Sequence, residues 1–354
     1  PPLSEKDGFL FCDSENVTGR FLVLGRQNGR WVGCPVKIPG ALELSDLRLI
    51  WQSGEAPEVQ FSCRSNLDVS VEITIHGELN GCQLAGDLQT AVPDESIPCR
   101  LTIPEHIAAN GGTLKLFVES ATRRRSAVET LDIALLAALR QSGETVDWSS
   151  VPIFSWNKFP GFTEKENEVA AFDANECSGT LQTAYSPVGL CFRIVIRDDQ
   201  HCNDKSESEI WQQDSLQFAF DPDSAKPWEP NAQFGLNGHR VLEYAVSSGK
   251  DKKITVWRHT SYDPLLLDNV SEERVQVNFS REQGCSIYEL IFPWECLGLN
   301  TMPAPGSEIG FSALLNDVDP EPAPGAPRGR HGLRIFKGIH PDKTPEKYGK
   351  LYLR

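Results

Sequence analysis

The sequence predicts an all-β protein made of two β-sandwich domains. Apolar and polar residues alternate with a period of two over many short segments, and glycine-containing turn signals separate these segments. The chain has 354 residues, which suits two domains at ~150 residues each. Short alternating strands joined by turns favour antiparallel sandwiches over parallel βαβ units.

The alternation can be followed along the chain. In residues 67–75, Leu, Val, Val, Ile and Ile alternate with polar residues, which is typical of a strand with one solvent-facing side. The same pattern recurs at 114–118, 190–196, 216–220 and 275–279. Residues 128–139 fit either a helix or a strand, and we favour a strand that closes the first sandwich.

The polar, glycine-containing stretch at 141–145 marks the boundary between the domains. We therefore expect domains at 1–140 and 146–354. The length and alternation of the first suit an immunoglobulin-like sandwich, and its sequence carries no motif that assigns a role. Because the chain begins Pro1-Pro2 without a Met, we interpret it as a trimmed product or a piece of a longer polypeptide.

Composition and charge exclude several functions. With 34 Lys and Arg against 49 Asp and Glu, the net charge is −15, so the surface repels nucleic-acid phosphates and we expect no nucleic-acid partner. No apolar run reaches the ~18 residues of a membrane span. The ten cysteines form no Cys-x-x-Cys pair, and we expect mostly buried free thiols. Cys191/Cys202 and Cys285/Cys296 remain possible local disulfides.

An ordered series of short motifs runs through the second half. The motifs are DWSSVP at 147–152, LCFRIVIRDD at 190–199, WQQDSLQFAFD at 211–221, YELIFPW at 288–294, GF through NDVD at 310–319 and YGKL at 348–351. Their order resembles the family 9 carbohydrate-binding modules, and the resemblance covers residues 146–354.

This resemblance implies a β-sandwich of immunoglobulin-like or jelly-roll type that binds sugars without catalysis. Members are usually modules of larger secreted enzymes, and some carry calcium. We therefore expect noncatalytic binding of a glycan in a secreted polysaccharide-processing system, an extracellular or cell-envelope location, and other domains of a larger polypeptide as possible partners.

Sugar binding needs a flat aromatic ring and directed polar partners for the hydroxyl groups. The family places one of its binding tryptophans where this chain has Trp211. A second family tryptophan has no counterpart in residues 339–345. Glu243 stands where such binders use an arginine, and Gln217 stands where they use a glutamate.

Other residues could complete the site. Trp228 on a proline-rich loop and Trp257 on a strand are candidates for the second aromatic wall, although each could instead serve packing. Arg258 and Asn316 would flank Trp211 if the family arrangement holds, and ordinary surface polarity is the alternative.

Acidic turns suggest a structural calcium ion. Ca²⁺ prefers several carboxylate and carbonyl oxygens, and we expect Asp198, Asp199 and Asp221 to supply them. Turn aspartates also occur for backbone reasons alone, through Asx-turns. The chain contains no EF-hand pattern, His-Glu-x-x-His motif, Gly-x-Ser-x-Gly motif or P-loop.

We therefore expect a binding protein rather than an enzyme. Two alternatives stay open. A glycosidase would need paired carboxylates at ~5–9.5 Å, and nothing in the sequence marks such a pair. A structural or docking module of a larger polypeptide, with a vestigial sugar site, would explain the missing clamp residues.

Overall fold

The structure is a computed structural model, and its strands are the main elements of the chain. It describes residues 3–6, 9–12, 19–27, 30–38, 41–51, 55–109, 111–121, 126–156, 161–165, 168–170, 177–227, 238–248, 253–319, 330–340 and 343–354.

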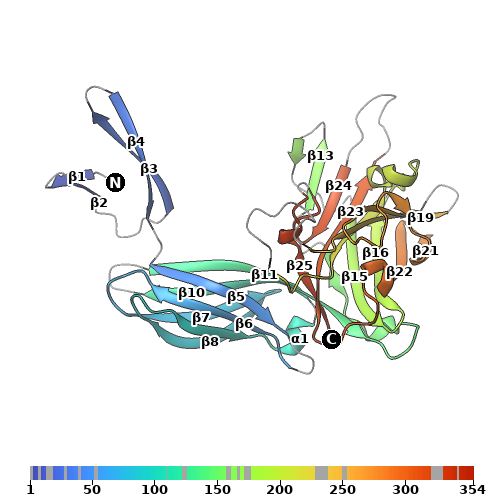
Figure 1. Cartoon of the computed structure of the whole chain (residues 1–354), viewed down its shortest axis with the longest axis horizontal. Coiled ribbons are helices and arrows are strands. Elements are labelled where there is room, and N and C mark those ends of the chain that lie inside the picture. The colour runs from blue at the N-terminus through green and yellow to red at the C-terminus, as the bar shows by residue number, and fades with distance from the viewer. Residues whose placement is uncertain are drawn as a thin grey trace. The chain divides into compact units, whose positions relative to one another are not determined.

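The chain divides into two compact units, shown in Figure 1. Unit 1 contains Pro1–Trp51, Ala56–Glu105 and Leu114–Ile133, and unit 2 contains Gln52–Glu55, His106–Thr113 and Ala134–Arg354. The domain limits expected from the sequence stay a prediction.

Unit 1 is built from antiparallel strands. Two hairpins (β1–β2 and β3–β4) precede a three-stranded sheet with the order β5-β6-β9, and β7 pairs with both β8 and β10. A short helix, α1 (Glu105–Ala108), follows β9. The strands are β1 (Leu3–Lys6), β2 (Phe9–Cys12), β3 (Gly19–Gln27), β4 (Arg30–Ile38), β5 (Leu42–Ile50), β6 (Glu58–Ser65), β7 (Val71–Leu79), β8 (Cys82–Ala91), β9 (Ile97–Thr102) and β10 (Gly112–Ala121).

The buried residues of unit 1 follow the predicted period of two. Val71, Ile73 and Ile75 of β7 are buried, and the residues between them are exposed. However, the strand begins at Val71 rather than at residue 67. The Ser65 hydroxyl accepts a hydrogen bond from the Leu67 backbone N–H at 3.1 Å. This local turn takes the place of the start of the expected strand.

In the part of the chain that the structure describes, unit 2 contains the strands from β12 on and four short 3-10 helices. The strands are β12 (Phe154–Ser155), β13 (Gly161–Lys165), β14 (Glu168–Ala170), β15 (Cys177–Ser186), β16 (Gly189–Asp198), β17 (Ser215–Asp221), β18 (Leu242–Ser248), β19 (Ile254–Ser261), β20 (Val270–Ser271), β21 (Gln276–Glu282), β22 (Cys285–Pro293), β23 (Glu308–Val318), β24 (Arg330–Ile335) and β25 (Gly349–Leu353). The 3-10 helices are η1 (Trp148–Ser150), η3 (Glu207–Gln212), η4 (Trp294–Leu297) and η5 (Pro345–Lys347).

Two antiparallel sheets make up unit 2. One has the order β12-β15-β16-β22-β21, and the other has the order β14-β13-β24-β23-β17-β18-β19-β20. The final strand, β25, pairs with the first residues of β23. Consequently β21 lies at an edge of the first sheet, and β19 and β20 lie at an edge of the second.

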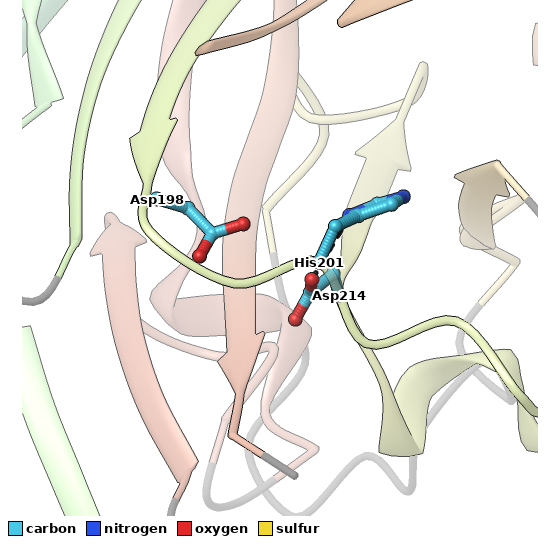
Figure 2. Close-up of side chains that lie close together, drawn as sticks. All are labelled: Asp198, His201 and Asp214. Carbon is cyan, nitrogen blue, oxygen red and sulfur yellow. Dashed lines mark hydrogen bonds and ion pairs between the residues drawn. The ribbon is translucent and has the colours of Figure 1, made fainter. Parts of the chain in front are cut away.

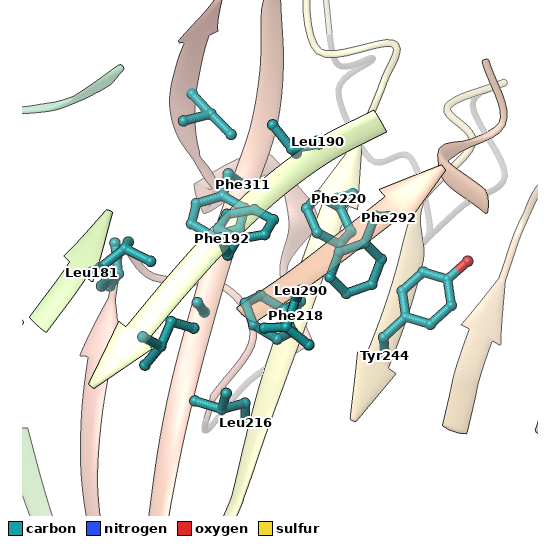
Figure 3. Packing of buried hydrophobic residues seen from close by; sticks show 14 of the residues in the cluster. Leu181, Leu190, Phe192, Leu216, Phe218, Phe220, Tyr244, Leu290, Phe292 and Phe311 are labelled. Carbon is teal, nitrogen blue, oxygen red and sulfur yellow. The ribbon is translucent and has the colours of Figure 1, made fainter. Parts of the chain in front are cut away.

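Aromatic side chains fill the space between these sheets. Figure 3 shows Phe192 of β16 and Phe292 of β22 packed against Phe218 and Phe220 of β17. The ring centroids of Phe192 and Phe218 are 5.3 Å apart, and those of Phe220 and Phe292 are 5.1 Å apart. Such spacings are typical of packed aromatic cores. The predicted all-β sandwich fold is confirmed.

The ambiguous segment at 128–139 forms a strand, as we favoured. It lies in β11 (Ser126–Arg140), which begins in unit 1 and ends in unit 2. The end of β11 does not close the first sandwich, because Leu136–Ala138 pair in parallel with β25 and Leu139 pairs with β15. The last residues of β11 are therefore part of unit 2.

The face of β17 that points away from the aromatic core is also covered. Ala219 on this face packs with Leu314 of β23 and with Ile339 and Tyr348 of the C-terminal segment. All seven residues of β17 are consequently buried.

In the described part of the chain, eight cysteines are free thiols, including Cys191, Cys202, Cys285 and Cys296. None of the described helices is long and apolar enough to cross a membrane.

Candidate functional site

Trp211 lies on the short helix η3, directly before β17. Its residue surface is 38% exposed, whereas the neighbouring Ile210 is buried. η3 lies against β17, β18 and β19, so Ile210 attaches the helix to the sheet while Trp211 remains open to solvent on one side. A partly exposed indole on a fixed element provides a surface on which a sugar ring can stack.

Gln217 and Trp257 share one row across the outer face of the sheet. The register places Gln217 of β17 opposite Ala245 of β18, and Ala245 opposite Trp257 of β19. Gln217 is 9% exposed and Ala245 is fully buried, whereas Trp257 is half-buried. The Trp257 indole N–H donates to the side-chain oxygen of Asn269 at 3.2 Å, which fixes the orientation of the ring.

Glu243 is buried and already paired within the protein. Lys343 donates to one of its carboxylate oxygens at 2.7 Å, and the Tyr348 hydroxyl donates to the other at 3.2 Å. Burial and the charge of Glu243 both raise the pKa of Tyr348. Both partners come from the C-terminal segment, in which the sequence lacks the second tryptophan of the family.

Two other expected rim residues also have internal partners. Arg258 donates to the Glu272 carboxylate and to the Leu267 carbonyl, both at 2.5 Å, and its guanidinium lies 5.9 Å from the centre of the Tyr244 ring. Asn316 is 2% exposed and donates to the Ser215 hydroxyl at 3.1 Å. Trp228 lies outside the described residues.

A cluster of acidic residues lies where β16 ends and β17 begins. Figure 2 shows Asp198, His201 and Asp214 together, and their possible ligand atoms all lie within 4.8 Å of one another. Asp214 accepts from the backbone N–H groups of Cys202 at 2.6 Å and Val318 at 2.9 Å, which fix its carboxylate in place.

A further aspartate, Asp317 of β23, lies near this cluster. A cavity of about 10 Å³ is lined by Asp198, His201, Asp214 and Asp317, among other residues. Burial first, and then the charges of Asp198 and Asp214, raise the pKa of Asp317 to about 9. Burial and the charge of Asp214 raise the pKa of Asp198 to about 6, although Arg281 donates to Asp198 at 3.1 Å.

These residues fit a hard cation. Asp198, Asp214 and Asp317 all line a space for about one water-sized sphere, and carboxylate oxygens suit Ca²⁺. A bound cation would relieve the mutual repulsion that raises the pKa values. Of the three expected ligands, Asp198 belongs to this cluster. Asp199 is exposed beside it, and Asp221 lies at the far end of β17, 2.7 Å from His239.

Sequence reasoning missed Asp214, His201 and Asp317 as a group. Asp214 comes directly before β17, and Asp317 lies near the end of β23. Because these two strands are antiparallel neighbours with Ser215 opposite Asn316, the two aspartates meet at one end of the pair. The sequence alone did not show that β17 pairs with β23, and this pairing brings the two aspartates together.

The chain belongs to the carbohydrate family 9 binding domain-like family. The family model matches residues 154–352, which is more than half of the chain. This is a family of binding modules, and its match confirms the resemblance inferred from the ordered motifs.

Similar solved structures include two structures of a family 9 carbohydrate-binding module from Caldicellulosiruptor kristjanssonii. The one in complex with cellotriose has 16% identity and a TM-score of 0.41, and the match covers 62% of this chain and 93% of that chain. The one in complex with glucose has 15% identity and a TM-score of 0.40, covering 62% and 95%. No curated protein matches this chain.

Proposed function

We propose that unit 2 binds a neutral glycan by stacking a sugar ring on Trp211. The exposure of Trp211 carries this proposal. Among the tryptophans whose burial the structure describes, Trp51, Trp156 and Trp294 are buried, Trp148 and Trp257 are intermediate, and Trp211 is exposed at 38%. A fixed aromatic face can cover the apolar C–H groups of a pyranose. Family membership supports the same function.

Titration calorimetry against a panel of neutral polysaccharides tests this function. One stacking surface gives a dissociation constant of about millimolar to micromolar. We expect Trp211→Ala to weaken binding about tenfold or more, which corresponds to about 1.4 kcal/mol. Because 38% of the Trp211 surface is exposed and the rest is buried, the melting temperature of the variant is measured beside its affinity, so that only folded protein is compared.

The matched control is Leu265→Ala, which removes another exposed apolar side chain, with 85% exposure. This control should bind glycans as the wild type does. Equal glycan affinities of the wild type and Trp211→Ala would show that Trp211 is not the platform.

A second candidate function is that of a docking module with a vestigial sugar site. The internal pairing of Glu243 with Lys343 and Tyr348 favours it, because this polar group is not available to a ligand. An empty glycan array together with tight association to another domain of the same polypeptide would favour docking over sugar binding.

We further propose that the module is noncatalytic and serves an extracellular or cell-envelope system that processes polysaccharides. The family match supports the binding role. Incubation of the folded protein with a broad polysaccharide set should release no reducing sugar. Release above the buffer control would instead establish glycosidase activity.

We also propose a structural Ca²⁺ ion held by Asp198, Asp214 and Asp317. The lining of one small cavity by three buried or nearly buried carboxylates supports it. A ligand present at ~100 times its dissociation constant stabilises the folded state by about 2.7 kcal/mol. We therefore expect CaCl₂ to raise the melting temperature of the EDTA-treated protein.

Asp317→Asn should remove most of this calcium-dependent shift, since one charged ligand is lost. The control Asp268→Asn changes an exposed aspartate and should keep the shift. A melting temperature that is the same with EDTA and with CaCl₂ would rule out this ion.

A further inference from the structure

An open groove of about 710 Å³ lies beside Trp257, apart from the Trp211 ring. One wall is the segment Asn203–Glu207, and the other is formed by Lys253–Trp257 and Ser271–Glu273. A volume of this size is within the ~300–1,000 Å³ range of small-molecule sites.

The groove follows the edges of the two sheets of unit 2. Its aliphatic lining comes from Ile254 and Val256 of β19, from Val275 directly before β21, and from Val277 of β21. Val256 and Val275 also belong to the core between the sheets, so the floor of the groove is a continuation of that core. A ligand in the groove would therefore cover apolar surface as well as polar groups.

Hydrogen bonds hold the wall at 203–207 in position. The Asn203 side chain donates to the Ser248 carbonyl at 2.9 Å, and the Lys205 backbone N–H donates to the Gln213 side chain at 2.5 Å. Gln213 is itself buried and donates to the Ser247 hydroxyl at 2.8 Å. The wall is thus formed before any ligand arrives, which lowers the entropic cost of binding.

The chemistry of the lining suits a neutral polyhydroxylated ligand. Trp257 supplies an aromatic ring, and Thr255 and Ser271 supply hydroxyl groups. The charged side chains of the lining have both signs, and carboxylates outnumber lysines; they are Asp204, Lys205, Glu207, Lys253, Glu272 and Glu273. Arg258 and Arg274 already hold Glu272, and the other charged groups provide hydrogen-bond partners for sugar hydroxyls. The excess of carboxylates disfavours anionic polymers.

The groove and the Trp211 ring are joined by one helix. The groove lining includes Glu207, the first residue of η3, and Trp211 lies four positions further along the same helix. At ~2 Å per residue, a 3-10 helix covers about 8 Å over this interval. A short oligosaccharide can extend over this distance.

We infer that this groove takes further units of the neutral glycan chain that stacks on Trp211, so that the module binds a stretch of several sugars rather than one terminal sugar. This inference rests on the proposed glycan binding. It adds Trp257 as a second platform and makes the affinity depend on the length of the glycan.

Titration calorimetry with the series from glucose through cellotriose to cellohexaose tests the inference. We expect the affinity of the wild type to rise about tenfold or more along the series. Trp257→Ala should lose the gain in affinity with glycan length, whereas Trp211→Ala should weaken binding at every length. Leu265→Ala serves as the control and should resemble the wild type.

The outcomes separate the two ideas. If Trp257→Ala keeps the wild-type gain with length while Trp211→Ala loses affinity, the groove is not a subsite and the proposed function stands. If the folded wild type binds no member of the series and no polysaccharide of the neutral panel, the proposed function itself fails. Oligogalacturonates should bind more weakly than cello-oligosaccharides of equal length, and tighter binding would contradict the preference for neutral chains.

Discussion

Glu272 is a buried carboxylate held by two arginines. Arg258 and Arg274 donate to it at 2.5 and 2.6 Å, and Glu272 is 4% exposed. Burial alone would raise the pKa of Glu272, but the hydrogen bonds and charge of Arg274, together with the charge of Arg258, outweigh burial and lower it from 4.5. A lowered folded-state pKa contributes stability above the unfolded-state value, and this stability is lost as the pH falls.

We therefore expect Glu272→Gln to destabilise the protein by about 3 kcal/mol at neutral pH, since Arg258 loses its buried charge partner. The difference from the wild type should shrink as the pH falls below 4.5. Urea unfolding at neutral pH and at a pH below 4.5 measures the difference in stability between the variant and the wild type. The adjacent Glu273→Gln is the control, because Glu273 is exposed and its loss should be nearly neutral. A difference that grows on acidification would contradict this account.

At the scale of single residues, the sequence predicted candidate binding residues better than it predicted their hydrogen-bond partners. It identified Trp211 as the indole to examine, and the structure gives that residue an exposed face. It could not reveal that Glu243 contacts Lys343 and Tyr348, which are about a hundred residues away along the chain. Such contacts depend on how the C-terminal segment crosses the sheet, which residue type and local spacing do not encode.

Gly189 shows how tightly the strands of unit 2 are packed. It is the first residue of β16 and pairs with Pro293 of β22. A Cβ atom added at Gly189 would lie 2.3 Å from the Phe292 carbonyl oxygen, which belongs to the backbone and has little freedom to move.

We expect Gly189→Ala to cost about 1–3 kcal/mol, because the two strands must separate to make room. Gly143→Ala is the matched control, since the nearest atom to its added Cβ lies 3.8 Å away. Denaturant unfolding of both variants measures the difference. Equal stabilities would mean that the β16–β22 pair can shift without cost.

At the scale of whole strands, the alternation of apolar and polar residues predicted which residues face the core. It did not predict that the opposite face of β17 is covered by other residues. Leu216, Phe218 and Phe220 face the core as the period of two requires. The residues between them are buried as well, because Ile339 and Tyr348 pack over that face. The alternation of residues within one strand predicts which side chains share a face. It cannot predict that a segment distant in the sequence will cover one of those faces.

At the scale of the whole molecule, the last residues of β11 belong to unit 2. Leu136–Ala138 pair with β25, and the side chains of Leu136 and Ala138 lie in the core of unit 2. The polar stretch at 141–145, which the sequence marks as a linker, follows these residues. The family model begins at residue 154 and does not include β11.

A fragment of residues 146–354 should therefore be less stable than a fragment of residues 134–354. The shorter fragment loses two buried core residues and leaves β25 without its parallel neighbour. Burial of one Leu side chain alone contributes about 1.5–3 kcal/mol. Thermal and urea unfolding of the two fragments measure the difference, and equal stabilities would show that β11 is dispensable.

The path of β11 also limits how this binding module can be moved between proteins. A gene fusion joined in the polar stretch at 141–145 would separate the module from a strand that it needs, although the sequence there looks like an ordinary linker. A junction that keeps the end of β11 with the C-terminal part of unit 2 must lie before Ala134, inside β11 itself. Recombination that respects the fold must therefore carry the two units together or rebuild the shared strand.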